Sequence, residues 1–244
     1  MSGIALVTGA SSGIGRAVAE HLLEAGWRVI CAARGQGKLK AVFAGRDETL
    51  IWPLDVTDAD AVAALPDALP TGWRDVEIIV ANAGSDVGGR KLFADGDMTD
   101  WASTIETNVV GVMRVCHALL PGMLTRKRCD VVIIGSISGL SAYPGGAAYS
   151  PSKYAVRSFA ESLRRDYPGA PLRVIEVRPG IVETGFATAR TGSAADAADF
   201  YDSFPAKLQA SDIAASVAFA IDQPQHVNIS EITVVPTGDK PFGK

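Results

Sequence analysis

The sequence predicts an α/β fold in which helices cover both faces of a doubly wound parallel sheet of about seven strands. Short apolar runs recur along the chain, and most of the segments between them are long enough for a helix. The run Val131–Ile134 is apolar at every position, as a parallel strand buried on both faces requires. The predicted strands are Ile4–Val7, Val29–Ala32, Thr49–Trp52, Val76–Ala81, Val131–Ile134, Leu172–Val177 and Ile229–Val235.

Length and composition predict a single domain over residues 1–244. Hydrophobic residues make up 48% and charged residues 20% of the chain, values typical of a soluble protein with a packed core. Thr188–Phe204, rich in alanine and aspartate, departs from this composition. We expect a mobile, partly helical insertion at about residues 185–210, over the carboxyl edge of the sheet where ligands bind in such folds.

Charge and cysteine content exclude several classes of protein. The net charge is −4 with both signs interspersed, so neither nucleic acid nor an anionic membrane is an expected partner. Met1-Ser2-Gly3 leads directly into the first apolar run without the basic flank of a signal peptide, and no stretch approaches the roughly 20 apolar residues of a membrane-spanning helix. The three cysteines are widely spaced, which favours a cytoplasmic protein without disulfides or a bound metal.

A glycine-rich turn follows the first apolar run and precedes a helical pattern. It reads Thr8-Gly9-Ala10-Ser11-Ser12-Gly13-Ile14-Gly15, with the spacing G-x-x-x-G-x-G. Glycines let the backbone approach a pyrophosphate closely, and the N-terminus of the helix attracts the anion. In this position the turn predicts a dinucleotide site, whereas the glycines taken alone would also suit a structural turn.

The end of the second apolar run predicts which nicotinamide dinucleotide binds. Many dinucleotide-binding folds have an acidic residue here that bonds the ribose 2′-hydroxyl, but this chain has Arg34 and no carboxylate in Cys31–Arg34. A guanidinium suits a 2′-phosphate, and Lys38 offers a second cation. The sequence therefore favours NADP over NAD, with a solvated surface arginine as the alternative.

Two further segments follow apolar runs and suit the same ligand. Asp55-Val56 would bond and contact an adenine, or else belong to a helix N-cap region. Asn82-Ala83-Gly84 supplies small residues where the dinucleotide backbone would pass, or else forms a simple turn.

Tyr149 and Lys153 predict a proton-transfer site. Their four-residue spacing puts both on one face of the helix expected from Ala148 to Tyr167. A tyrosine has a pKa of roughly 10, and a nearby ammonium favours its phenolate. Ser136, just beyond the fifth apolar run, supplies a hydroxyl for the same substrate oxygen, as carbonyl reduction requires. By itself, a Tyr-x-x-x-Lys pair is more often a solvated helix face.

Together these motifs resemble the short-chain dehydrogenase/reductase family over almost the whole chain. The resemblance implies a Rossmann-type sheet and an oxidoreductase that transfers a hydride between nicotinamide and a CH–OH group. It rests on the Thr8–Gly15 turn, Asn82-Ala83-Gly84, Asn108, Ser136, Tyr149-Ser150-Pro151-Ser152-Lys153 and Pro179-Gly180-Ile181-Val182-Glu183-Thr184.

The resemblance also implies roles for individual residues. Ser136 and Tyr149 would bind the reacting oxygen. Lys153 would hold the nicotinamide ribose and lower the pKa of Tyr149, and Asn108 would anchor a water that relays protons. Without the resemblance, Asn108 is interpreted as a helical asparagine that bonds backbone nearby. The residues implied to line the cofactor turn and the nicotinamide are Ile14, Pro179, Gly180, Val182 and Thr184.

Three other segments resemble a subgroup of NADP-dependent 3-hydroxy acid dehydrogenases that act on serine and allothreonine, and also sulfoacetaldehyde reductases. They are Leu120–Met123, Gln223–Ile229 and Val235–Thr237. Such substrates are small, polar and often anionic, so a cation would face the nicotinamide. Arg190 is the candidate anchor, with an exposed surface arginine as the alternative.

Two other functions fit the same motifs. One is a ketone or sugar carbonyl reductase of broad specificity, because this fold serves many substrates. The other is an NADP-binding regulator without turnover, which predicts the loss of Ser136, Tyr149 or Lys153, and all three are present. The family resemblance further implies a homo-oligomer, a dimer or tetramer, that pairs the helices around Trp101–Leu120 and Ser150–Tyr167.

Overall fold

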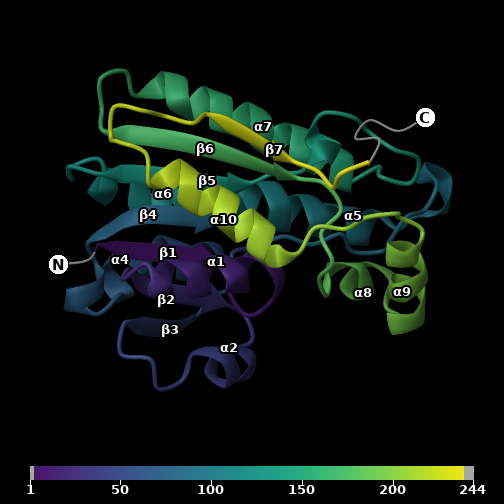
Figure 1. The fold of residues 1–244 in the computed structure, drawn as a ribbon, viewed down its shortest axis with the longest axis horizontal. Helices are drawn as coiled ribbons and strands as arrows, with labels where there is room; N and C mark the ends of the chain where they lie inside the picture. Colours follow the sequence, from purple (N-terminus) through teal and green to yellow (C-terminus); the bar gives the residue numbers. More distant parts are fainter. Residues whose placement is uncertain (1–2, 239–244) are drawn as a thin grey trace.

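The computed structural model describes residues 3–238 and contains a seven-stranded sheet in the order β3-β2-β1-β4-β5-β6-β7 (Figure 1). All neighbouring strands pair in parallel, which confirms the predicted doubly wound α/β fold. Each strand begins and ends within two residues of its predicted position. The strands are β1 Ile4–Thr8, β2 Arg28–Ala33, β3 Thr49–Pro53, β4 Val76–Ala81, β5 Cys129–Ile134, β6 Leu172–Pro179 and β7 Glu231–Val234.

Helices cover both faces of the sheet and bury two separate apolar clusters. Side chains alternate between the faces of a strand, so Val131 and Ile133 of β5 belong to one cluster and Val132 and Ile134 to the other. One face is covered by α1 Gly13–Glu24, α2 Gln36–Phe43 and α10 Ala210–Ile221. The other is covered by α3 Ala59–Ala63, α4 Leu65–Ala68, α6 Gly111–Met123 and α7 Tyr149–Asp166.

The remaining helices lie in the connections. The predicted insertion contains two helices, α8 Phe186–Thr191 and α9 Ala194–Asp202. A π-helical turn, η3 Glu106–Val110, joins α5 Met98–Ile105 to α6. Three short 3₁₀ turns complete the set: η1 Thr71–Trp73, η2 Phe93–Asp95 and η4 Ile137–Gly139. Across residues 3–238, no helix combines the length and apolar character needed to cross a membrane.

The strand order reverses between β1 and β4, and the carboxyl ends of these two strands are tied together. The Thr8 hydroxyl accepts the backbone N–H groups of Asn82 and Ala83, each at 3.0 Å. Ligands of open α/β sheets bind at this reversal point.

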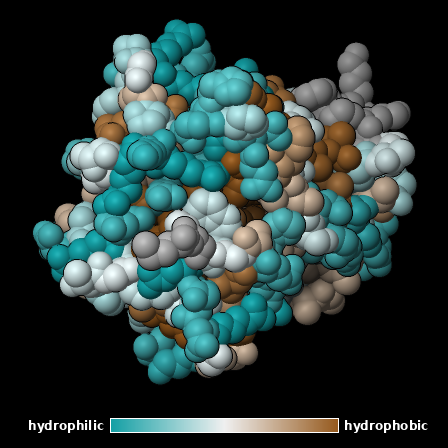
Figure 2. Space-filling view, turned by 60° about the vertical axis from the view of Figure 1, so that its left-hand side comes forward, coloured by the Kyte–Doolittle hydropathy of each residue, from teal (hydrophilic) through white to brown (hydrophobic). Residues whose placement is uncertain are grey.

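The opposite, amino-terminal side of the sheet comes forward in Figure 2, where hydrophilic side chains predominate over scattered hydrophobic ones.

Candidate active site

A cavity of about 1030 Å³ opens at the carboxyl edge of the sheet. It is large enough for a dinucleotide together with a small substrate. Of the predicted site residues, Gly15 and Asn108 do not line it. Those that do are Gly9, Ser11, Ser12, Gly13, Ile14, Arg34, Asp55, Val56, Asn82, Ala83, Gly84, Ser136, Tyr149, Lys153, Pro179, Gly180, Val182, Thr184 and Arg190.

The glycine turn fits a pyrophosphate. Gly9 and Gly13 have positive φ angles of 67° and 54°, which suit glycine. A Cβ on Gly15 would come within 2.5 Å of the Gly9 carbonyl oxygen, so Gly15 lets α1 pack against the turn rather than contacting a ligand itself. Ser12 precedes α1 without a capping bond from its side chain, which leaves the first N–H groups of the helix for an anion.

Two cations lie where a ribose 2′-phosphate would be expected. Arg34 and Lys38 line the cavity, are exposed, and form no ion pair with any residue in 3–238. Asp55 also lines it, and its Oδ1 accepts the backbone N–H and the hydroxyl of Thr57 at 3.0 and 2.8 Å. The N-cap of α3 is Asp58, so Asp55 is not the capping residue.

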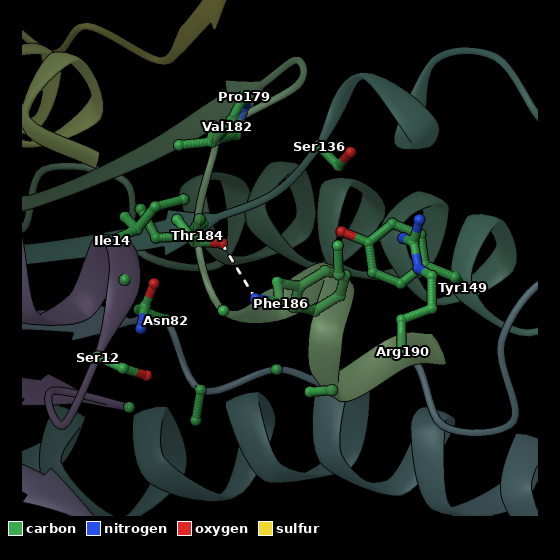
Figure 3. A pocket seen from close by; sticks show the side chains of 18 of the residues that line it. Ser12, Ile14, Asn82, Ser136, Tyr149, Pro179, Val182, Thr184, Phe186 and Arg190 are labelled. Carbon is green, nitrogen blue, oxygen red and sulfur yellow. Dashed lines mark hydrogen bonds between the residues drawn. The ribbon is translucent and has the colours of Figure 1, made fainter. Parts of the chain in front are cut away.

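Tyr149, Ser136 and Lys153 meet at the start of α7. In Figure 3 the phenol oxygen of Tyr149 points into the cavity, on the side where Ser136 lies. Ser136 lies two residues beyond β5 as the N-cap of η4, and its Oγ accepts the N–H of Ser138 at 3.1 Å. The buried Lys153 donates from Nζ to the Ile134 carbonyl at 2.9 Å, and its Nζ lies 5.6 Å from the centroid of the Tyr149 ring.

Burial and charge act in opposite directions on these groups. Burial raises the pKa of Tyr149, and Arg190 is the charge that lowers this pKa most. Burial also lowers the pKa of Lys153 to about 8, against a smaller opposing effect of Glu176. The cation that most favours the phenolate is therefore Arg190, whereas the sequence points to Lys153.

Asn108 holds the loop after β4 instead of lining the cavity. Its Oδ1 accepts the Ser85 N–H at 2.7 Å, and its Nδ2 donates to the Ser85 carbonyl and to Ser152 Oγ at 2.8 and 3.0 Å. The interpretation as an asparagine that bonds nearby backbone is wrong, because Ser85 lies 23 residues away in the sequence. Asn108 belongs to η3, and π-helical turns are frequent at functional sites.

Arg190 is not an exposed surface arginine. Its side chain is 9% exposed, and its Nε lies 2.6 Å from Oδ2 of Asp86. The guanidinium lies 5.4 Å from the Tyr149 ring and 5.1 Å from the Phe186 ring, as Figure 3 illustrates.

Sequence reasoning missed several residues at this end of the cavity. Asp86 follows β4 closely, and its place just beyond a strand end is the one signal that pointed to it. Arg90, Phe186 and Phe200 also line the cavity. The Arg90 guanidinium lies 4.4 Å from the Tyr143 ring and 5.0 Å from the Phe200 ring. These segments meet through the tertiary fold, so no sequence spacing relates them.

Comparisons with known proteins agree with this geometry. The family model for short chain dehydrogenases matches residues 3–194. Sulfoacetaldehyde reductase 2 of Chromohalobacter salexigens is 38% identical, over 97% of this chain and 95% of the relative. Serine 3-dehydrogenase of Agrobacterium fabrum is 35% identical, over 97% and 94%.

Two solved structures are also similar. The closed form of a serine dehydrogenase complexed with NADP⁺ superimposes with a TM-score of 0.91 and 33% identity, over 95% of this chain and 94% of that one. A variant of actinorhodin polyketide ketoreductase with NADPH has a TM-score of 0.84 and 32% identity, over 96% of both chains. The chain therefore belongs to the short-chain dehydrogenase family, as its motifs predict, and is an oxidoreductase.

Proposed function

We propose that this enzyme transfers a hydride between NADP(H) and a small anionic hydroxy or carbonyl compound such as a 3-hydroxy acid. The observation that carries the proposal is that Tyr149, Ser136 and Arg190 line the same cavity as the glycine turn. The names of the sulfoacetaldehyde reductase and serine dehydrogenase relatives support the same class of substrate.

The residues of the cavity fit NADP. The Gly9–Ile14 turn would hold the pyrophosphate, Asp55 and Val56 would contact the adenine, and Arg34 with Lys38 would bind the 2′-phosphate. Asn82-Ala83-Gly84 would lie along the middle of the cofactor. Pro179, Gly180, Val182 and Thr184, which line the same cavity, would surround the nicotinamide end. When bound, the nicotinamide supplies or accepts the hydride.

The protein residues move the proton. In reduction, Tyr149 donates its phenol proton to the substrate oxygen, and in oxidation its phenolate takes that proton back. Ser136 donates a hydrogen bond to the same oxygen. Arg190 favours the phenolate, and Lys153, whose Nζ lies 5.6 Å from the centroid of the Tyr149 ring, would hold the ribose hydroxyls. The resemblance assigns Asn108 the anchoring of a water that would return the proton to solvent, while its side chain is bonded to Ser85 and Ser152 and does not line the cavity.

The charges around Tyr149, at the end of the cavity where the substrate would bind, favour the binding of an anion. Two guanidiniums, Arg90 and Arg190, face one carboxylate, Asp86. A free Nη edge of Arg190 suits the two oxygens of a carboxylate or sulfonate. Phe186, Phe200 and Phe204 also line the cavity, and this apolar wall favours the second candidate, a ketone reductase of broad specificity.

Initial rates separate these candidates. We expect NADPH to support reduction of sulfoacetaldehyde or malonic semialdehyde with a kcat/KM at least about tenfold above that for acetone or an aldose. Equal rates across the panel would favour the broad reductase, and rates that are higher with NADH would contradict the cofactor assignment. NADPH binding without turnover of any carbonyl would favour the regulator.

We also propose that the enzyme acts in the cytoplasm as a single-domain subunit of a homodimer or homotetramer. Its three cysteines are buried and unpaired, which suits a reducing compartment. Met113 of α6 and Tyr154 of α7 are 44% and 41% exposed, which suits helix pairing between subunits. Light scattering after gel filtration measures the number of subunits.

A further inference from the structure

Asp86 contacts the guanidinium of Arg190 at one atom only. Asp86 Oδ2 lies 2.6 Å from Nε as an ion pair that lacks the alignment of a hydrogen bond, and the two side chains are 5% and 9% exposed. Within residues 3–238, neither Nη1 nor Nη2 has a hydrogen-bond acceptor. An arginine has five N–H donors in a planar fork, so this contact leaves the Nη edge available to a ligand.

Asp86 lies in the loop after β4, and hydrogen bonds hold the residues on either side of it. On one side of it, Ser85 is bonded through both its N–H and its carbonyl to Asn108. On the other side, the N–H of Val87 donates to Thr104 Oγ1 at 3.1 Å. Both Asn108 and Thr104 are buried. The carboxylate is thus anchored to the helices behind it, while Arg190 comes from α8, a helix of six residues.

We propose that Asp86 is a positioning residue, which holds Nε of Arg190 so that the Nη edge faces the carboxylate or sulfonate of the substrate. The proposal rests on the proposed function, in which Arg190 binds the anionic group. Asp86 touches neither substrate nor cofactor in this role, and it acts through Arg190.

Removing the Asp86 charge has two opposite consequences, so the sign of the effect is informative. If Asp86 only neutralises Arg190, its loss makes the site more positive, and an anion binds more tightly. If Asp86 orients Arg190, its loss frees the guanidinium to adopt other rotamers, and an anion binds more weakly.

The test compares an anionic and a neutral alcohol that share the reacting end, 3-hydroxypropionate and 1,3-propanediol, with NADP⁺ as the oxidant. For Asp86→Asn we expect the KM for the hydroxy acid to rise about tenfold with little change in kcat. The kcat/KM for the diol should stay within about twofold. Asp86→Glu keeps the charge and should recover part of the loss. The control is Asp202→Asn, which breaks an exposed ion pair with Lys207 at the end of α9.

A binding measurement covers the case in which turnover of these alcohols is slow. Isethionate and NADPH form a complex that cannot react, so calorimetry gives the dissociation constant of the anion alone. We expect it to be about tenfold weaker in Asp86→Asn. If unaltered protein binds no isethionate, the proposed anion site itself is wrong. If it binds and Asp86→Asn binds equally or more tightly, the positioning role is overturned while the proposed function stands.

A double-mutant cycle tests the coupling between Asp86 and Arg190 directly, with Asp86→Glu taking the place of Asp86→Asn if the latter folds poorly. Arg190→Lys retains the cation but lacks the fork, so it should lose affinity for the anion as Asp86→Asn does. The double variant should lose little more than either single variant, because both changes remove the same oriented guanidinium. Additive losses would overturn the proposal, as would equal losses for anionic and neutral alcohols, which a purely structural role predicts.

Discussion

Two buried aspartate–arginine pairs, at opposite edges of the sheet, differ in how completely the arginine is satisfied. At the amino edge, Asp130 of β5 accepts Nε and Nη2 of Arg173 of β6 at 2.7 and 2.6 Å. The other donors of Arg173 reach the carbonyls of Gln223, Val227 and Ile221. At the carboxyl edge, Asp86 contacts Arg190 at Nε alone.

The difference separates an arginine whose donors are all used by the fold from one with donors to spare. A guanidinium whose five donors all have protein partners contributes to the fold and has nothing left for a ligand. One that contacts its carboxylate at a single atom, beside the cavity and Tyr149, keeps donors for a further partner. Substitutions at the amino edge should therefore lower the free energy of unfolding. Substitutions at the carboxyl edge should instead change turnover and substrate specificity.

The largest expected effect is on turnover, at the carboxyl edge. Tyr149→Phe removes the proton that the substrate oxygen requires, so kcat should fall about a thousandfold. The dissociation constant of NADPH, measured by fluorescence, should stay within about twofold. Tyr167→Phe at the end of the same helix is the control. Substantial residual activity in Tyr149→Phe would contradict the mechanism.

The amino edge should respond in stability instead. Asp130→Asn leaves the Arg173 charge buried without a counterion and also breaks the 2.8 Å pair with Arg128, which together should lower the free energy of unfolding by about 3–5 kcal/mol. Asp75→Asn breaks an exposed pair with Arg126 and should cost less than about 1 kcal/mol. Urea denaturation measures both. If Asp130→Asn lowered the free energy of unfolding no more than Asp75→Asn does, the proposed difference between the two edges would be wrong.

The burial of Lys153 lowers the free energy of unfolding by an amount that depends on pH. Its pKa is about 8 in the folded protein and 10.5 as an unperturbed group. The unfolded chain therefore binds more protons between these values, and stability rises with pH across that window. Lys153→Met should be more stable than the unaltered protein at pH 7, by up to about 3 kcal/mol. The advantage should shrink between pH 8 and 10.5, and a constant difference would refute this pKa.

The smallest expected effect is on cofactor preference, at the part of the carboxyl edge where Arg34 lines the cavity. Arg34→Ala should raise the KM for NADPH about tenfold and leave that for NADH nearly unchanged, because the 2′-phosphate is present in NADPH alone. The control is Lys40→Ala, which removes a cation from α2, the helix that follows Arg34, at a position that does not line the cavity. Steady-state kinetics with both cofactors test the pair, and equal losses for NADPH and NADH would rule out the assigned role.

Much of the fold, and the set of residues that line the candidate cofactor cavity, was predictable from the sequence because both depend on local patterns. Apolar runs located all seven strands to within two residues, and the glycine turn could be found because its spacing and its place after β1 are sequential features. The Tyr149–Lys153 spacing was informative for the same reason, since helix geometry relates residues four apart. Asn108 was found by resemblance, and its actual partner, Ser85, was not.

The sequence by itself determined the sheet, the glycine turn and the helix that carries Tyr149 and Lys153, because each is set by the pattern of a continuous segment. The tertiary structure alone decided which charges surround the Tyr149 phenol. Asp86, Arg90 and Arg190 come from the loop after β4 and from α8, which are about 100 residues apart in the chain. Their approach depends on the packing of α8 over the carboxyl edge, and no periodicity within either segment encodes it.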